Sequence, residues 1–168
     1  AAIQNNAHAL NDVEEMDAVV GQLLDYARLG EQEPVLATDL KALAEAAAAP
    51  FSGRAQRLTL QLAELPPAPV RPLLLKRALT NLLDNAIKHG GGDIVLQLQA
   101  AQWQGRPSVQ FTVLDRGPGI AAHAVDAAKR PFVRLDAARS SAGSGLGLAI
   151  VERASRLHSG EFRLEPRA

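Results

Sequence analysis

The stretch from Pro72 to Gly92 constrains the fold of this chain more than any other part of its sequence. Its leucines and one alanine recur at three- and four-residue steps, which is the spacing of one buried helix face. Pro72 suits the first turn of a helix, and the consecutive glycines at 90–92 end it. The pattern therefore predicts an amphipathic helix that must pack on an apolar layer. The residues expected to face inward are Leu75, Leu79, Leu82, Leu83 and Ala86.

The same helix is expected to present a polar face. Its members are Asn81, Asn85, Lys88 and His89, which are spaced so that they project from one side. Amide, ammonium and imidazole groups gathered in this way need a polar cleft to face. Asparagine oxygens are hard, neutral ligands that suit Mg²⁺ bound between phosphates. An ordinary amphipathic helix with a solvated face fits the same residues, so this motif alone leaves both interpretations open.

The remaining elements predict an α/β sandwich, in which helices cover one face of a mixed sheet. Alternating apolar residues indicate strands at Arg57–Leu62, Ile94–Gln99, Ser108–Leu114 and Glu161–Leu164. Helices are expected at Leu40–Ala49, with Thr38 as the cap and Pro50 as the stop, near Ala121–Ala128 and at Leu146–Leu157. The prolines within 65–70 exclude a helix or an inner strand there.

A long helix is predicted ahead of this domain, between residues 3 and 29. Its apolar residues follow a coiled-coil-like seam at Ala9, Val13, Met16, Val20, Leu23 and Ala27. A surface helix packed on its own domain would show the same pattern. Gly30 and Pro34 then interrupt the helix. We therefore expect a helical segment at residues 1–30, a linker at 31–37 and one domain at 38–168.

Composition excludes several classes of function. The 168 residues carry 18 basic and 18 acidic side chains, so no overall positive field is available for binding nucleic acid. The absence of cysteine excludes disulfides, thiolate zinc sites and a cysteine nucleophile, and the four histidines lack metal-ligand spacing. No run approaches the roughly 20 apolar residues that span a bilayer. We expect a soluble piece of a longer protein.

A second polar motif follows a predicted strand, at Asp115-Arg116-Gly117-Pro118-Gly119. The Asp115 carboxylate can accept a hydrogen bond from an exocyclic amine, and the two glycines allow the backbone to approach a flat ligand. A simple turn after a strand explains the same residues.

Glycines and arginines gather in the last third of the chain. Gly143-Ser144-Gly145-Leu146-Gly147 opens a predicted helix, where backbone N–H groups and the helix dipole favour a phosphate. The motif follows no strand and lacks the Rossmann and P-loop patterns. Pro131-Phe132-Val133-Arg134, with Arg139 after it, can bring arginines onto phosphates. A solvated loop with one buried Phe is the alternative.

Together, the four motifs in this order resemble the catalytic ATP-binding domain of bacterial sensor histidine kinases, which has the Bergerat fold. Residues 81–90 match the family's N box, 115–119 its first glycine box, 131–134 part of its F box and 143–147 its second glycine box. The resemblance extends from Thr38 to the end of the chain. Residues 11–34 are similar to the second helix of the family's dimerisation and phosphotransfer domain, in the manner of the EnvZ osmosensor group.

The resemblance implies a reaction and a set of binding residues. The domain would bind ATP with Mg²⁺ and transfer the γ-phosphoryl group to a histidine, for relay to an aspartate of a response regulator. Asn85 would coordinate Mg²⁺, Asp115 would bind the adenine amino group, and His89 would lie near the adenine. The other implied members are Asn81 on the helix, Lys88, Arg134 and Arg139 at the phosphates, Gly117 and Gly119 beside the base, and Gly143, Gly145 and Gly147 as hinge and phosphate cradle.

The chain departs from the family in three places. The phosphoacceptor motif begins with a His followed by an acidic residue, but His8 precedes Ala9 and no other His fits. The acceptor is therefore expected outside this chain. Lys129 stands where the F box usually has a Phe, which predicts a weaker anchor for that segment. The family's last glycine-rich turn and strand would follow Ala168.

Other activities occur on the same fold. ATPases of the gyrase and mismatch-repair type place a Glu four residues before the metal-binding Asn, where this chain has Asn81. An amide is no general base, and Asp84 points about 100° away from Asn85 around the helix, so hydrolysis is not expected. A pseudo-enzyme that binds partners through residues 3–29 and a serine kinase of the anti-sigma-factor type stay as alternatives. The implied setting is the cytoplasmic part of an inner-membrane sensor, with a second copy and a response regulator as partners and no nucleic acid.

Overall fold

The computed structural model describes residues 20–165, apart from 22, 25, 54–56 and 135–143. The chain divides into two units, Ala1–Gln32 and Glu33–Ala168. In the first unit every described residue from 20 to 28 is helical. The predicted seam positions Ala9, Val13 and Met16 lie outside the described residues. Within the described part of the chain, no helix has the length and apolar character that crossing a membrane would require.

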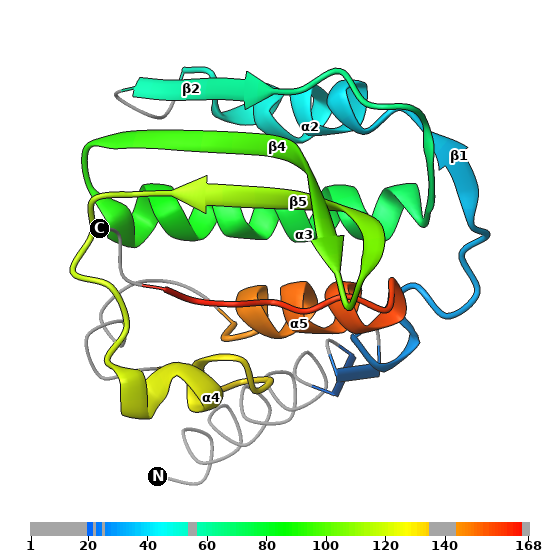
Figure 1. Ribbon diagram of the computed structural model, residues 1–168. Helices are drawn as coiled ribbons and strands as arrows, with labels where there is room; N and C mark the ends of the chain where they lie inside the picture. The colour runs from blue at the N-terminus through cyan, green and yellow to red at the C-terminus, as the bar shows by residue number, and fades with distance from the viewer. Residues whose placement is uncertain (1–19, 22, 25, 54–56, 135–143, 166–168) are drawn as a thin grey trace, which may run out of the picture. The chain divides into compact units, whose positions relative to one another are not determined.

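The second unit is built on a mixed three-stranded sheet in the order β2-β4-β5 (Figure 1). Its strands are β2 (Arg57–Leu62), β4 (Asp93–Trp103) and β5 (Arg106–Leu114). β2 runs parallel to β4, with Leu58 opposite Ile94, and β5 runs antiparallel to β4, with Phe111 opposite Leu98. The three strands predicted in these regions are confirmed. The mixed character of the sheet follows from the long return through a helix between β2 and β4.

β4 and β5 are longer than predicted because a two-residue turn joins them. Gln104 and Gly105 both have positive φ, 51° and 74°, which is the backbone of the tight hairpin turn that matches strand twist. Pairing therefore continues to Trp103 opposite Arg106. Sequence reasoning missed this turn because glutamine is not a residue that favours positive φ.

Helices α2 (Leu40–Ala48) and α3 (Pro72–Asn85) cover one face of the sheet, and α5 (Gly147–Leu157) packs against α3 (Figure 1). Leu79 and Leu83 of α3 join Leu96 of β4 in a core cluster from which water is almost completely excluded. Burial of such side chains contributes about 1.5–3 kcal/mol each. The predicted fold class, a sheet covered by helices on one face, is confirmed.

Two short strands form a separate antiparallel pair, β1 (Leu36–Thr38) with β3 (Ala68–Val70). Pro69 lies opposite Ala37 in this pair. In the main sheet Pro107 lies on the edge strand β5, and the central strand β4 contains no proline. The cap of α2 was predicted one residue too early. Asp39 is the N-cap, and its carboxylate accepts a hydrogen bond from the Ala42 N–H at 3.0 Å. Thr38 belongs to β1, so its hydroxyl donates to the Leu36 carbonyl instead, at 2.9 Å.

Short helical turns connect the larger elements. Ala49–Phe51 (η1) continues α2, and Ala122–Ala124 (η3) leads into α4 (Val125–Ala128) where a short helix was predicted. The strand predicted at Glu161–Leu164 is wrong, because the structure gives this segment no strand pairing. The Phe162 carbonyl accepts a hydrogen bond from a side chain, the Lys129 ammonium at 2.6 Å, where a strand would use a neighbouring backbone.

The first turn of α3 is capped by a residue that is distant in the sequence. Its N-cap, Arg71, supplies no side-chain hydrogen bond. The Glu33 carboxylate accepts hydrogen bonds from the N–H groups of Leu73 at 2.6 Å and Leu74 at 2.9 Å. A helix N-terminus leaves such groups unpaired and carries a partial positive charge, so the carboxylate stabilises it in both respects.

His158, just after α5, ties that helix to the start of α3. Its Nε2 accepts a hydrogen bond from the Arg71 N–H at 2.9 Å, and its Nδ1 lies 2.8 Å from the Ala154 carbonyl oxygen. A carbonyl can only accept, so Nδ1 carries a proton and donates to it, while Nε2 accepts. The Arg71 guanidinium in turn donates to the Leu157 carbonyl at 2.9 Å.

The face of the sheet away from the helices carries paired glutamines. Gln97 donates from Nε2 to the Gln61 side chain at 2.6 Å, and Gln99 donates to Gln110 at 3.0 Å. Each of these cross-strand pairs joins the side-chain amides of two neighbouring strands by a hydrogen bond.

We predict that His158→Ala lowers the free energy of unfolding by about 1–3 kcal/mol, because the half-buried Arg71 N–H loses its acceptor. Urea denaturation at fixed pH measures the change. His123 is exposed in η3, so His123→Ala is the matched control and should stay within about 0.5 kcal/mol of the parent chain. Equal losses in the two variants would contradict the role of His158.

Candidate functional site

The C-terminal end of α3 widens into a π-helical turn, Ala86–Gly90 (η2). Single π-turns inside helices are rare and are often found at functional sites. Because a π-turn holds more residues than an α-turn, Lys88 and His89 do not occupy the angles that α-helical spacing predicts. Both are exposed, whereas Asn81 and Asn85 are half-buried on α3.

Two of the predicted polar residues are held by neighbours on the same helix. The Asn81 amide donates from Nδ2 to the Arg77 carbonyl at 3.0 Å. The Lys88 ammonium lies 2.6 Å from a carboxylate oxygen of Asp84, with both side chains about two-fifths exposed. An exposed pair of this kind is worth little energy, so Lys88 can exchange this partner for another anion.

The loop that begins at Asp115 packs against the π-turn with no space between the backbones. A Cβ at Gly117 would lie 2.6 Å from the His89 carbonyl oxygen, and a Cβ at Gly90 would lie 2.5 Å from the Asp115 Cβ. The Gly117 N–H donates to Asp115 Oδ1 at 2.7 Å, which fixes the carboxylate. These glycines are therefore required for contact between two parts of the protein. Gly119 differs, because it has φ +71° with open space around it.

The second glycine motif contacts the segment at Phe132. The Phe132 N–H donates to the Gly145 carbonyl at 3.0 Å, and a Cβ at Gly145 would lie 2.9 Å from the Phe132 carbonyl carbon. Phe132 itself has φ +63°, an uncommon backbone conformation for a bulky residue. Arg134 is half-buried just beyond it. The predicted residues Arg139 and Gly143 lie outside the described part of the chain.

α5 begins beside Asn81. A Cβ at Gly147 would lie 3.6 Å from the Asn81 side-chain oxygen. The N-cap Leu146 supplies no side-chain hydrogen bond to the first N–H groups of α5. Such groups bind anions, and the helix dipole adds to the attraction. The fold thus brings the N-terminus of one helix next to the amide of another.

These contacts form two clusters joined by α3 and its π-turn. One holds Asn81 with Gly147, and the other holds Gly90 with Asp115 and Gly117. Sequence reasoning did not identify the contact of Gly90 with Asp115, because the three consecutive glycines already explained the end of the helix. Among the described residues, no group of three His, Cys, Asp or Glu side chains could hold a metal ion. A divalent ion here would rely on amide oxygens and on oxygens that its ligand brings.

Comparison with known proteins identifies the family. Residues 70–168 match the family described as histidine kinase-, DNA gyrase B-, and HSP90-like ATPases, and the chain belongs to this family. A probable sensor histidine kinase of Mycobacterium tuberculosis is 34% identical over 155 residues, which are 90% of this chain and 40% of that protein. The resemblance to the catalytic domain of sensor histidine kinases is confirmed.

Solved structures agree with this assignment. Full-length ShkA in complex with AMPPNP superposes with a TM-score of 0.67 and 30% identity, over 93% of this chain and 34% of that one. The histidine kinase domain of the E. coli osmosensor EnvZ gives a TM-score of 0.58 and 34% identity, over 82% of this chain and 84% of that one. The chain spans less than half the length of the Mycobacterium relative and of ShkA.

We predict that Gly90→Ala lowers the free energy of unfolding by about 1–3 kcal/mol, because the new methyl group overlaps the Asp115 side chain near its backbone. Chemical denaturation of the variant measures the loss. Gly53 has nothing within 4 Å of an added Cβ, so Gly53→Ala makes the same chemical change in open space. Should Gly90→Ala be as stable as Gly53→Ala, the close contact with Asp115 would be refuted.

Proposed function

We propose that this chain binds ATP with Mg²⁺ and transfers the γ-phosphoryl group to a histidine outside residues 1–168. The observation that carries the proposal is the position of Gly147 beside Asn81, which brings the anion-binding end of α5 next to the polar face of α3. Membership of the ATPase family and the relatives named sensor histidine kinases support it. The likeness to ShkA, solved with AMPPNP, supports binding of a nucleoside triphosphate.

The phosphate end of the nucleotide would lie at the start of α5. There the backbone N–H groups after Gly145 and Gly147 would donate to phosphate oxygens, with Arg134 and Lys88 as cationic partners. Arg139 and Gly143, outside the described residues, are proposed for the same end. Asn85 would contribute a neutral oxygen to the metal, as expected for an ion that also binds phosphates. When bound, Mg²⁺ would offset the charge that develops on the transferred group.

The base would lie at the other cluster. The Gly117 N–H fixes one oxygen of Asp115, so the carboxylate is oriented before any ligand arrives. It would accept a hydrogen bond from the adenine amino group, with Gly117 and Gly119 beside the ring and the exposed His89 near it. A pre-oriented acceptor costs less entropy on binding than a mobile one.

Transfer to a histidine is favoured over hydrolysis by the residues around Asn85. Asn81 holds an amide where the water-activating carboxylate of the gyrase type would be, and its Nδ2 is bound to the Arg77 carbonyl. The adjacent carboxylate, Asp84, points about 100° away from Asn85 around the helix. A side chain without a basic atom at this point cannot activate water as a general base.

The rest of the protein follows from the same proposal. Residues 1–30 would be the second helix of a dimerisation and phosphotransfer domain, 31–37 a linker and 38–168 the catalytic domain. A second copy of the protein would pair through the dimerisation helices, and a response regulator would take the phosphoryl group. The whole protein would be a sensor of the bacterial inner membrane with this domain in the cytoplasm.

The test is phosphotransfer in trans. The chain is mixed with γ-labelled ATP, Mg²⁺ and a purified helical hairpin from the parent protein that carries the acceptor histidine. We expect acid-labile label on the hairpin only when both the chain and Mg²⁺ are present. ATP binding without transfer would favour the pseudo-enzyme, and label that resists acid would indicate a serine kinase. Failure to bind ATP would refute the proposal.

We predict that Asn85→Ala abolishes Mg²⁺-dependent ATP binding, because the metal loses an oxygen ligand on α3. Calorimetric titration with and without Mg²⁺ measures the affinity. The unfolding free energy should change by less than about 1 kcal/mol, because this half-buried side chain is not part of the apolar core. Gln110→Ala removes an amide from the opposite face of the sheet and should leave ATP affinity unchanged. Undiminished affinity in Asn85→Ala would remove Asn85 from the metal site.

A further inference from the structure

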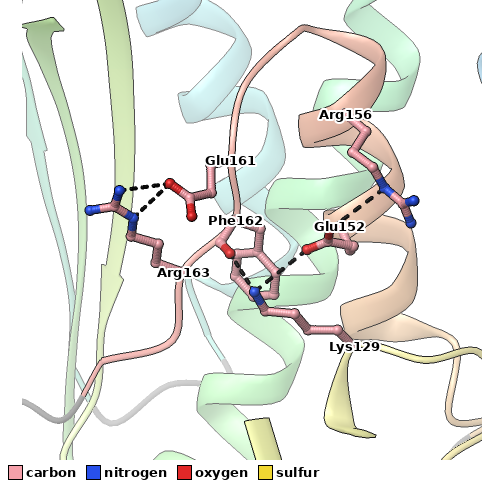
Figure 2. A network of polar contacts seen from close by, with 6 residues as sticks. All are labelled: Lys129, Glu152, Arg156, Glu161, Phe162 and Arg163. Atoms are coloured by element: carbon pink, nitrogen blue, oxygen red, sulfur yellow. Dashed lines mark hydrogen bonds and ion pairs between the residues drawn. The ribbon is translucent and has the colours of Figure 1, made fainter. Parts of the chain in front are cut away.

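Lys129 follows α4 and directly precedes the segment 130–134. Its ammonium donates to the Phe162 carbonyl at 2.6 Å and lies 3.6 Å from Glu152 Oε2 (Figure 2). The same nitrogen is 5.2 Å from the centre of the Phe162 ring. One charged group thus joins the end of α4, the middle of α5 and the C-terminal segment. The side chain is only 20% exposed, so these contacts lie largely out of water.

Glu152 lies between two cations, and this ammonium is the less exposed of them. Its side chain is 24% exposed, and its Oε2 is buried with no hydrogen-bond partner. The other oxygen, Oε1, lies 3.5 Å from Arg156 Nε, whose side chain is mostly in solvent (Figure 2). A buried carboxylate oxygen without a nearby cation is costly, so removal of the Lys129 charge would destabilise the arrangement around it.

These contacts show what surrounds Lys129 at the position where the family pattern has a phenylalanine. Lys129 replaces a phenylalanine of the family pattern, and the sequence therefore predicted a weaker anchor for this segment. The structure gives the lysine three partners, including the face of a phenylalanine contributed by Phe162. Cation–π attraction and a charge-assisted hydrogen bond take the place of apolar packing.

Backbone hydrogen bonds connect Lys129 to the candidate phosphate end. The Arg130 N–H donates to the Ala127 carbonyl at 3.0 Å, and the Val133 N–H donates to the Arg130 carbonyl at 3.4 Å. Phe132, held between them in its uncommon conformation, donates to Gly145 at 3.0 Å. Because Glu152 and Gly147 belong to the same helix, Lys129 fixes 130–134 against the element that carries the anion-binding N–H groups.

We propose that Lys129 is a positioning residue for the nucleotide reaction, holding Phe132 and Arg134 at the N-terminus of α5 through Glu152 and Phe162. This inference rests on the proposed function for its catalytic consequence. Its structural part, the fixing of 130–134, stands on the contacts of Lys129 alone. Two separate measurements on the 168-residue chain therefore test it.

The first measurement is amide hydrogen exchange without nucleotide. In Lys129→Met the Phe132 amide should exchange about tenfold faster or more, because its bond to Gly145 opens more often. The Ile150 amide, bonded to the Leu146 carbonyl inside α5, should be unchanged and shows that the variant is folded. Lys41→Met is the matched control, because Lys41 makes an ion pair with Glu64, which raises the pKa of the lysine, at a remote place on α2.

The second measurement compares ligands that do and do not carry phosphates. ATP affinity in Lys129→Met should fall about five- to tenfold while adenosine affinity stays within about twofold, because Asp115 and its loop are untouched. Lys129→Arg keeps the charge and should restore most of the loss, and Glu152→Gln should show a smaller loss of the same kind. A merely structural role would lower the affinities for ATP and adenosine together.

The outcomes separate this inference from the proposed function. Unchanged exchange at Phe132 in Lys129→Met overturns the positioning role whatever the ligand does. Equal losses of ATP and adenosine affinity, or no rescue by Lys129→Arg, overturn its effect on the phosphate end. If the parent chain binds no ATP, the proposed function fails, and the exchange result still decides whether Lys129 fixes the segment.

Discussion

Burial of the leucine face of α3 against the sheet is the constraint on which the rest of the structure depends. Leu79 and Leu83 are almost fully enclosed with Leu96, and this packing sets the rotation of the helix about its own axis. With the rotation fixed, Asn81 and Asn85 must lie on another side. A change in the packing register of one residue would turn these amides by about 100° and bring polar groups into the core. The apolar core and the polar site are thus two results of one periodic pattern.

Backbone contact holds the parts of the site that are not on α3. Gly90 meets Asp115 and Gly117, and Gly145 meets Phe132, at separations that no side chain would fit. Gly117 packs on the main chain of His89 and Gly90, and Gly145 packs on that of Phe132, whereas Gly90 faces the Asp115 side chain. The glycines of the motifs therefore have a folding role in addition to any contact with a ligand, and one substitution tests both together.

The fold could be predicted because its signals are local. The leucine spacing of α3 and the alternation in β2, β4 and β5 are read within one element, and each of these predictions is confirmed. The contacts that sequence reasoning missed join distant residues, such as Glu33 with Leu73 and Lys129 with Phe162. The sequence does not show which group a carboxylate or an ammonium will contact, so the role of such a side chain is known only from the folded structure. The predicted contacts between the site residues and a nucleotide are tested by binding experiments.

The paired glutamines on the open face of the sheet have a consequence for its behaviour in solution. Gln61, Gln97, Gln99 and Gln110 bond to one another across the strands, and Thr59 and Thr112 lie at adjoining positions of the same face. None of these side chains gains or loses a proton in the range where proteins stay folded. The middle of this face therefore keeps the same polarity from acid to alkaline conditions. Contacts made by these uncharged groups are therefore not weakened by added salt.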